Sequence, residues 1–300
     1  MYFNEALKEY ERFILLELKA VTAKGYIHDL KSLCIYTRNC RIDQVTDNQV
    51  TGFLTFLQEI GYQYNGVAKK AMAYRNFWKW LNKKGIPSFF YDLIPCMDFE
   101  WTPKRVATEE NYQKLLSVIP EKGYCHIRDR AIVMLLWDTG ARRGEILSIN
   151  ESDLNLVDMK TIVKTEKSRG KRPFREVHWK KETNEALKKW LEVKHLIESS
   201  KYIEEPKALF WGSTNNYQGR RLTGNAVGTA LRKYSDLAKI PSFNPHSARH
   251  RFGHELSKKG ANNSIISSML GHSDLRSSYV YTEMNNKENQ DAYDKYMRNS

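Results

Sequence analysis

The chain has 300 residues, with 48 lysines and arginines against 35 aspartates and glutamates, which gives a formal net charge of +13. The 41% share of hydrophobic residues excludes global disorder, and the sequence has neither an apolar run of 18 residues nor a secretion signal, so we expect a cytoplasmic protein without a membrane span. The excess of cations favours a polyanionic partner such as nucleic acid, although a generic basic protein accounts for it equally well.

Four stretches within the first hundred residues carry apolar residues at helical spacing. They are 5–19, 23–37, a segment with Thr46 or Asp47 as its N-cap, and 65–82. Glycine and prolines then punctuate residues 85–105, which is typical of a linker. We therefore predict a helical domain over residues 1–100 and a second domain over 105–300.

The fourth predicted helix is strongly basic. Its candidate DNA contacts are Lys69, Lys70, Arg75 and Lys79. These cations either bind phosphate groups or form a solvated helix face, and the pattern favours neither.

The second domain is predicted to be mainly helical with a small antiparallel sheet. A helix begins near Thr108, and 131–137 is a buried apolar helix. The β-type runs 161–163 and 174–179 flank a basic stretch and predict a hairpin with a charged turn. Helices return from Thr183 onward.

Two arginine-containing motifs stand in this domain. In Thr139–Leu147, Gly140 is expected to end the apolar helix and Arg142 to begin the next turn. Taken by itself, this motif is explained better by a corner between two helices with solvent-exposed arginines. In Pro245–Phe252, proline starts a helix and places His246 and Arg249 on one face near its N-terminus, which suits a phosphate. A His-x-x-Arg spacing by itself is common by chance.

The sequence predicts neither a metal nor another cofactor. His246, His250 and His254 share a helical spacing, but Arg249 and Arg251 would repel a cation between them. The four cysteines form no C-x-x-C pair, and no P-loop motif is present.

The third motif is Gly271-His272, followed by Tyr281 nine residues after the histidine. This combination is rare by composition, although Tyr281 alone reads equally as a core aromatic. The ordered set of Arg142, His246-x-x-Arg249, Gly271-His272 and Tyr281 resembles the tyrosine recombinases, also called phage integrases. Tyr281 has the family's nine-residue offset and Tyr279 does not.

The resemblance covers nearly the whole chain. Thr22-x-x-x-Tyr26-x-x-Asp29-Leu30 is similar to the first helices of the family's core-binding domain, so residues 1–100 are expected to be that SAM-like DNA-binding domain and 105–300 the catalytic domain. The size resembles simple Xer-type members without an arm-binding domain. Ala141 and Ala248 replace the family's usual leucines, and His178-Trp179 replaces a common Pro-Leu, with more effect on packing than on chemistry.

The resemblance implies a site-specific recombinase. A tyrosine attacks a DNA phosphodiester, forms a 3′-phosphotyrosine, and exchanges strands through a Holliday junction during integration, excision or dimer resolution. The implied roles are Tyr281 as nucleophile, Arg142 and Arg249 as phosphate ligands, His246 as proton acceptor, His272 as a hydrogen-bond donor to the phosphate, and Glu145 as an orienting residue.

The family's catalytic lysine has three candidates here. Lys164, Lys167 and Lys171 all lie in or beside the hairpin turn, which is longer than usual for the family. We choose Lys167 because its spacing from Ile162 matches simpler members, with Lys164 second. Lys164, Lys171 and Arg143 are also candidate DNA contacts.

The implied partners are double-stranded DNA and further copies of the chain. The tail 285–300 has a helix-like apolar stripe and is expected to dock on a neighbouring protomer, linking four subunits on two DNA sites at the nucleoid, rather than fold back on its own domain. Two other functions compete: a type IB-like topoisomerase and a non-catalytic sequence-specific DNA-binding protein.

Overall fold

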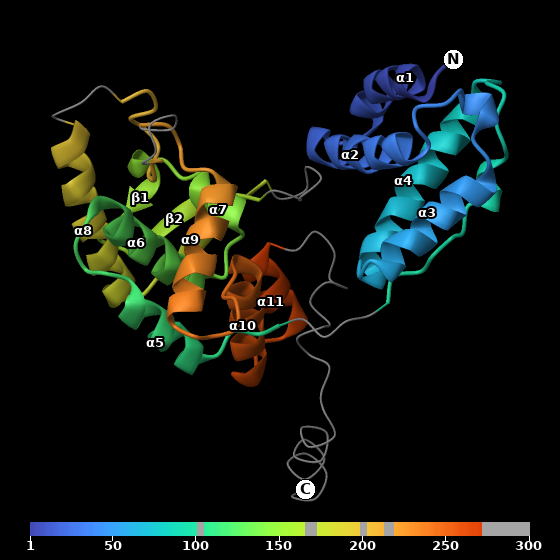
Figure 1. Ribbon diagram of the computed structural model, residues 1–300. Coiled ribbons are helices and arrows are strands. Elements are labelled where there is room, and N and C mark those ends of the chain that lie inside the picture. The colour runs from blue at the N-terminus through green and yellow to red at the C-terminus, as the bar shows by residue number, and fades with distance from the viewer. Residues whose placement is uncertain (101–104, 166–172, 199–202, 213–218, 272–300) are drawn as a thin grey trace, which may run out of the picture. The chain divides into compact units, whose positions relative to one another are not determined.

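The computed structural model describes residues 1–100, 105–165, 173–198, 203–212 and 219–271 (Figure 1). The chain divides into two compact units, Met1–Pro103 and Lys104–Ser300, and each is described by itself. Several predicted features lie outside the described residues, namely Lys167, Lys171, His272, Tyr279, Tyr281 and the tail 285–300.

The first unit is helical, as predicted. Its elements are α1 (Phe3–Glu17), α2 (Ala20–Tyr36), η1 (Ile42–Gln44), α3 (Asp47–Glu59), α4 (Tyr64–Lys83) and η2 (Tyr91–Leu93). The predicted cap of the third helix is confirmed, because the Thr46 hydroxyl accepts from the backbone N–H of Gln49 at 3.2 Å. The Gln49 side chain in turn accepts from the backbone N–H of Thr46 at 3.0 Å, so the first turn has both of its capping bonds.

Aromatic side chains build the core of the first unit. Phe3 from α1 stacks on Phe77 of α4 with ring centroids 5.5 Å apart, and Trp78 meets Phe77 edge-on at 5.1 Å. All three are fully buried. Since α4 also packs against α2 and α3, this basic helix is the central element of the unit.

The second unit surrounds one apolar helix with further helices and a small sheet. Its elements are α5 (Glu109–Val118), α6 (Tyr124–Thr139), α7 (Arg143–Leu147), η3 (Glu151–Asp153), β1 (Leu154–Asn155), β2 (Lys160–Lys164), β3 (Phe174–His178), α8 (Lys181–Glu198), α9 (Gly224–Leu237), α10 (Pro245–Lys258) and α11 (Asn263–Leu270). The predicted start at Thr108 is confirmed, because its hydroxyl accepts from the backbone N–H of Asn111. Every residue from 131 to 137 is buried, as the apolar run predicts.

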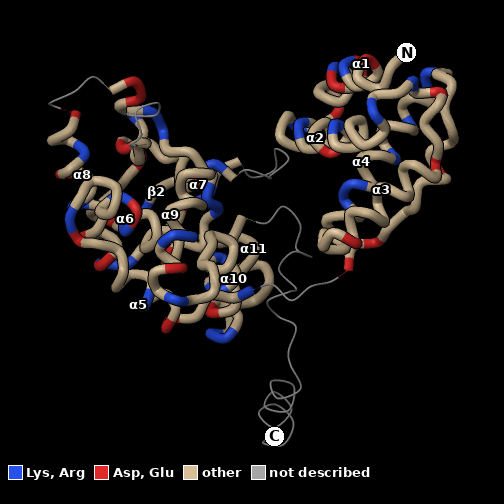
Figure 2. Tube along the Cα trace, in the orientation of Figure 1, with Lys and Arg blue, Asp and Glu red and all other residues tan. Residues whose placement is uncertain are grey.

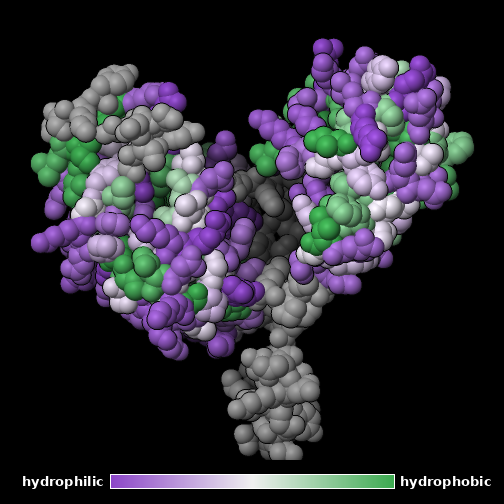
Figure 3. Space-filling view, viewed as in Figure 1, coloured by the Kyte–Doolittle hydropathy of each residue, from purple (hydrophilic) through white to green (hydrophobic). Residues whose placement is uncertain are grey.

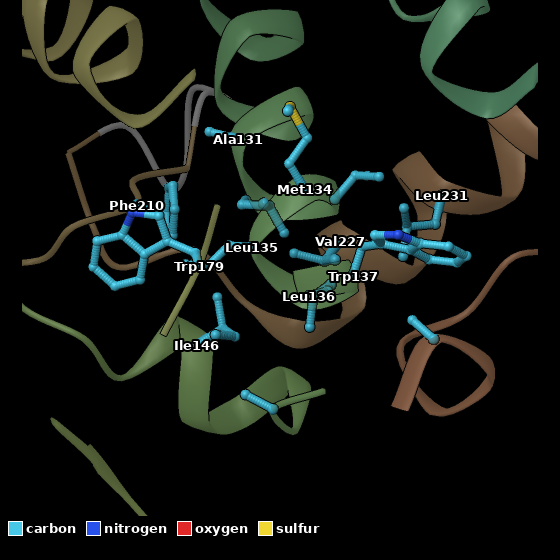
Figure 4. Close-up of a cluster of buried hydrophobic side chains, with 14 of the residues drawn as sticks. Ala131, Met134, Leu135, Leu136, Trp137, Ile146, Trp179, Phe210, Val227 and Leu231 are labelled. Carbon is cyan, nitrogen blue, oxygen red and sulfur yellow. The ribbon is translucent and has the colours of Figure 1, made fainter. Parts of the chain in front are cut away.

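Helix α6 passes through the centre of this unit's core (Figure 4). Trp137 stacks face to face on Tyr112 of α5 at 4.1 Å, while its other neighbours include Phe243, whose ring centroid is 6.1 Å away. Helices α8 and α10 both pack on α6. The end of α6 is therefore held from several sides, which fixes the position of the residues that follow it.

The predicted hairpin is present, in a three-stranded antiparallel sheet of order β1-β2-β3. Val163 pairs with Arg175 and Lys164 with Phe174 across the two long strands. The sequence did not indicate β1, which is only two residues long and lacks alternation. Strand β3 ends at His178, one residue earlier than predicted, and Trp179 is buried in the core instead.

The described helices include none that is long and apolar enough to cross a membrane. Figure 3 shows hydrophilic residues over most of the visible surface of each unit, with apolar residues in separate patches. Lysine and arginine positions occur on both units rather than in a single block (Figure 2).

Candidate active site

Arg142 lies where the chain turns from α6 into α7. Gly140 ends α6 with φ +58°, as the sequence predicts, in the left-handed region that favours glycine. A Cβ at this glycine would stand 2.7 Å from the ring of Phe252, so the approach of α10 also excludes a side chain. The turn therefore delivers Arg142 from a rigid, closely packed corner.

Glu145 holds Arg142 through both of its oxygens. The backbone N–H of Arg142 donates to Oε2 and the guanidinium Nη1 donates to Oε1, each at 2.8 Å. The Glu145 side chain is fully buried and Arg142 is only 14% exposed. This geometry is what an orienting carboxylate requires.

Arg249 lies on α10, and two local sequence features fix where this helix begins. Asn244 caps the helix by accepting from the backbone N–H of Ser247 at 2.9 Å, and Pro245 occupies the first turn as predicted. Arg249 is buried and donates from Nη1 to the carbonyl of Gly140 at 2.9 Å and from Nη2 to the carbonyl of Leu270 at 2.6 Å. It thus bridges the C-terminal ends of α6 and α11, where helix dipoles favour a cation.

The two guanidinium groups converge on the end of α11. Arg142 donates to the carbonyl of Gly271 at 3.3 and 3.4 Å, one residue beyond the carbonyl that Arg249 binds. Gly271 takes φ +66° and directly precedes His272, the first residue of the undescribed C-terminal stretch. His246 lies exposed on the first turn of α10, three residues before Arg249. The structure thus brings together Arg142, Glu145 and Arg249, with His246 on the same helix as Arg249.

The basic candidates of the first unit have different surroundings. Lys70 pairs with Asp29 at 2.6 Å, and the two side chains are only 12% and 9% exposed. Arg75 donates to the backbone carbonyl of Ile94. Both therefore have partners within their own unit, whereas Lys69 and Lys79 are exposed. The phosphate contacts expected of all four side chains stay predictions.

Arg143 and Lys164 are the described candidate DNA contacts in the second unit. Arg143 lies along α9, where a Cβ at Gly224 would stand 2.7 Å from its Nε and one at Gly228 3.3 Å from its Nη1. Two glycines one helical turn apart thus make room for this side chain. Lys164 is exposed at the end of β2.

Arg175 contacts the site, although it belongs to none of the sequence motifs. From β3 it donates Nη2 to Glu145 Oε2 at 2.6 Å, and its side chain is 8% exposed. Burial and the charge of Arg142 lower the pKa of Arg175, and Glu145 opposes this effect. The available signal was strand alternation, because Arg175 occupies the same face as Val177, where an apolar residue is expected.

Comparisons with known proteins agree on one family. A model of the phage integrase family matches residues 105–288. The tyrosine recombinase XerC of Roseiflexus castenholzii is 26% identical over 95% of this chain and 90% of its own, and XerD of Oceanobacillus iheyensis is 25% identical over 97% of both. Among solved structures, the Tn1549 transposon integrase bound to transposon right-end DNA has a TM-score of 0.73 at 19% identity, covering 99% of both chains. The XerH recombinase bound to its difH substrate has a TM-score of 0.68 at 19% identity, covering 91% of this chain and 79% of that one.

Proposed function

The chain belongs to the phage integrase family, and from this premise we propose that it is a site-specific DNA recombinase of the tyrosine type. Such an enzyme binds double-stranded DNA, cleaves it through a 3′-phosphotyrosine and rejoins strands by way of a Holliday junction. The observation that carries the proposal is the convergence of Arg142 and Arg249 on the carbonyls of Leu270 and Gly271. Leu270 and Gly271 lead directly into His272, and Tyr281 follows nine residues after that histidine.

The two arginines are assigned to the scissile phosphate. The phosphorane-like transition state gains charge on its non-bridging oxygens, and charge-assisted hydrogen bonds from fixed donors stabilise it. A guanidinium has five N–H donors, and Arg142 and Arg249 use some of theirs on Glu145 and the helix carbonyls. Because these intramolecular bonds already fix both side chains, little reorganisation is needed when the phosphate binds.

The remaining roles are proposals that rest on the family motif. Tyr281 is the nucleophile. The hydroxyl of tyrosine as a residue type ordinarily has a pKa of about 10, so a tyrosine nucleophile needs a proton acceptor at neutral pH. His246 is exposed and suits that task, while His272 would donate to the phosphate. Glu145 orients Arg142 and does not react.

The strand register favours Lys167 over Lys164 as the general acid. Lys164 pairs with Phe174 and shares the exposed face of the sheet with Ile162. Val163 and Arg175 occupy the opposite face, where Arg175 contacts Glu145. Lys164 therefore points away from the carboxylate that holds Arg142. This favours Lys167, which follows β2 in the sequence, as the general acid that protonates the leaving oxygen.

Replacing the leaving 5′-oxygen by sulfur tests this assignment. A thiolate leaves without protonation, so the cleavage defect of Lys167→Ala is expected to shrink from about 10²-fold or more to a few-fold on a 5′-bridging phosphorothiolate duplex. The measurement is the rate of covalent adduct formation. Lys164→Ala and Lys171→Ala serve as matched controls, and rescue of either one instead of Lys167→Ala would reassign the acid.

We further propose that four protomers assemble on two DNA sites and act at the nucleoid within the cytoplasm. The tail 285–300, which lies outside the described residues, would dock on a neighbouring protomer through its apolar stripe. Strand exchange needs two duplexes held together, which a single protomer on one site does not provide.

Recombination between two sites on one plasmid tests the proposed function. The DNA site is first selected from random duplexes by binding, and two copies are placed on a supercoiled plasmid. We expect deletion or inversion products that depend on both copies and need no ATP. Relaxation without recombinants would indicate a topoisomerase, and binding without any covalent adduct would indicate a non-catalytic DNA-binding protein.

A further inference from the structure

We propose that Arg175 is a positioning residue for cleavage, which holds Glu145 and, through it, the phosphate ligand Arg142. The proposal rests on the recombinase function stated above and adds a residue that belongs to none of the motifs by which the chain was recognised. Arg175 reaches the site from β3, whereas Arg142 and Glu145 come from the start of α7.

The contacts make Glu145 the shared partner of two arginines. Oε1 accepts from the Arg142 guanidinium at 2.8 Å, and Oε2 accepts from the Arg142 backbone N–H at 2.8 Å and from Arg175 Nη2 at 2.6 Å. The carboxylate is fully buried, so its orientation depends on these donors. Arg175 supplies the only one of the three that does not come from Arg142 itself.

Arg175 is also packed against Gly271. A Cβ on this glycine would stand 2.6 Å from Arg175 Nε and 2.9 Å from its Cδ. Gly271 offers its carbonyl to Arg142 and is followed by His272. Arg175 therefore lies between the carboxylate that orients Arg142 and the backbone that leads into the next motif.

The cost of burying this side chain indicates that packing alone does not explain it. Arg175 Nε and Nη1 are buried and have no hydrogen-bond partner among the residues that the structure describes. An unsatisfied buried donor is rare in folded proteins and destabilises them. An apolar residue opposite Val163 would fill the same strand position without that cost, so the charge facing Glu145 is the feature that requires arginine.

The expected consequence of losing Arg175 is a looser Arg142, with weaker stabilisation of the transition state and unchanged affinity for DNA. Removing one preorganised donor from an active site typically costs 10²–10³-fold in rate, and a residue acting through another is expected to cost somewhat less, about 10–100-fold. The variant Arg175→Met removes the charge at similar length. Arg175→Lys keeps a cation for Glu145 but loses the planar fork, and we expect an intermediate rate.

The test measures covalent adduct formation on two duplexes, one with an ordinary scissile phosphate and one with a neutral methylphosphonate. A neutral linkage needs no arginine to balance its charge, so the Arg175→Met defect should fall below about threefold on it. Arg142→Ala calibrates this pattern. Lys160→Met, which breaks the exposed pair with Glu176 on the same sheet, is the matched control and should behave as wild type on both duplexes.

A double-mutant cycle supplies the second measurement. If Arg175 acts through Arg142, adding Arg175→Met to Arg142→Ala should slow cleavage by less than about twofold further. Equal defects on both duplexes, or fully multiplicative effects in the cycle, would overturn the proposal. Absence of any adduct with the wild-type protein would instead refute the recombinase function, so the two failures are distinguishable. If Arg175→Met fails to fold, the same measurements are made with Arg175→Lys.

Discussion

Tyr281→Phe is expected to abolish the covalent protein–DNA adduct, while Tyr279→Phe leaves most of it. The substitution removes only the hydroxyl oxygen that would attack phosphorus, so the loss should be at least about 10³-fold, as is usual when a nucleophile is deleted. The measurement uses a nicked suicide duplex, from which the cleaved fragment escapes and traps the adduct for detection on a denaturing gel.

DNA binding provides the control for this experiment. Both phenylalanine variants are expected to bind the duplex with wild-type affinity, because phosphate contacts elsewhere supply most of the binding free energy. A persistent adduct in Tyr281→Phe together with its loss in Tyr279→Phe would transfer the nucleophile to Tyr279. Loss in both variants with intact binding would indicate that the segment tolerates neither change.

Helix starts, helix ends and the hairpin could be predicted from the sequence, because each depends on residues that are close together in the chain. Thr46 and Thr108 cap their helices, Gly140 ends α6 in the left-handed conformation, and Pro245 starts α10. Each depends on groups within about four residues, where side-chain chemistry and backbone preference act directly. The strand alternation that predicts the hairpin is equally local.

The assembly of the site depends on contacts between distant residues, which no local pattern contains. Arg249 reaches a carbonyl 109 positions away at Gly140, and Arg175 reaches Glu145 across 30 positions. The family motif predicts a functional role for Arg249, but only the fold shows that it joins the C-terminal ends of two helices. Lys70 illustrates the converse, because its basic helix suggested a phosphate contact and the fold pairs it with Asp29.

Glu145→Gln is expected to cause the largest loss of stability among conservative changes in the site. The amide keeps the size of the side chain but removes the only negative charge that Arg142 and Arg175 contact in the described structure. Those guanidinium groups are 14% and 8% exposed, so they remain desolvated and uncompensated. Breaking a buried ion pair in this way costs about 3–5 kcal/mol, which for a unit of this size lowers the melting temperature by about 6–20 °C.

Glu176→Gln on β3 is the control for Glu145→Gln. Both variants remove one negative charge, but only Glu145 is buried, so the difference in stability measures the effect of burial. Glu176 pairs with Lys160 at 3.1 Å, but the two side chains are 43% and 34% exposed, so Glu176→Gln should change stability by less than about 1 kcal/mol. Calorimetry or thermal circular dichroism of both variants measures the difference. Equal melting temperatures would mean that water or nearby residues already compensate the two arginines. Glu145 would then not be the carboxylate on which the geometry of Arg142 depends, and the proposed role of Arg175 would lose its intermediary.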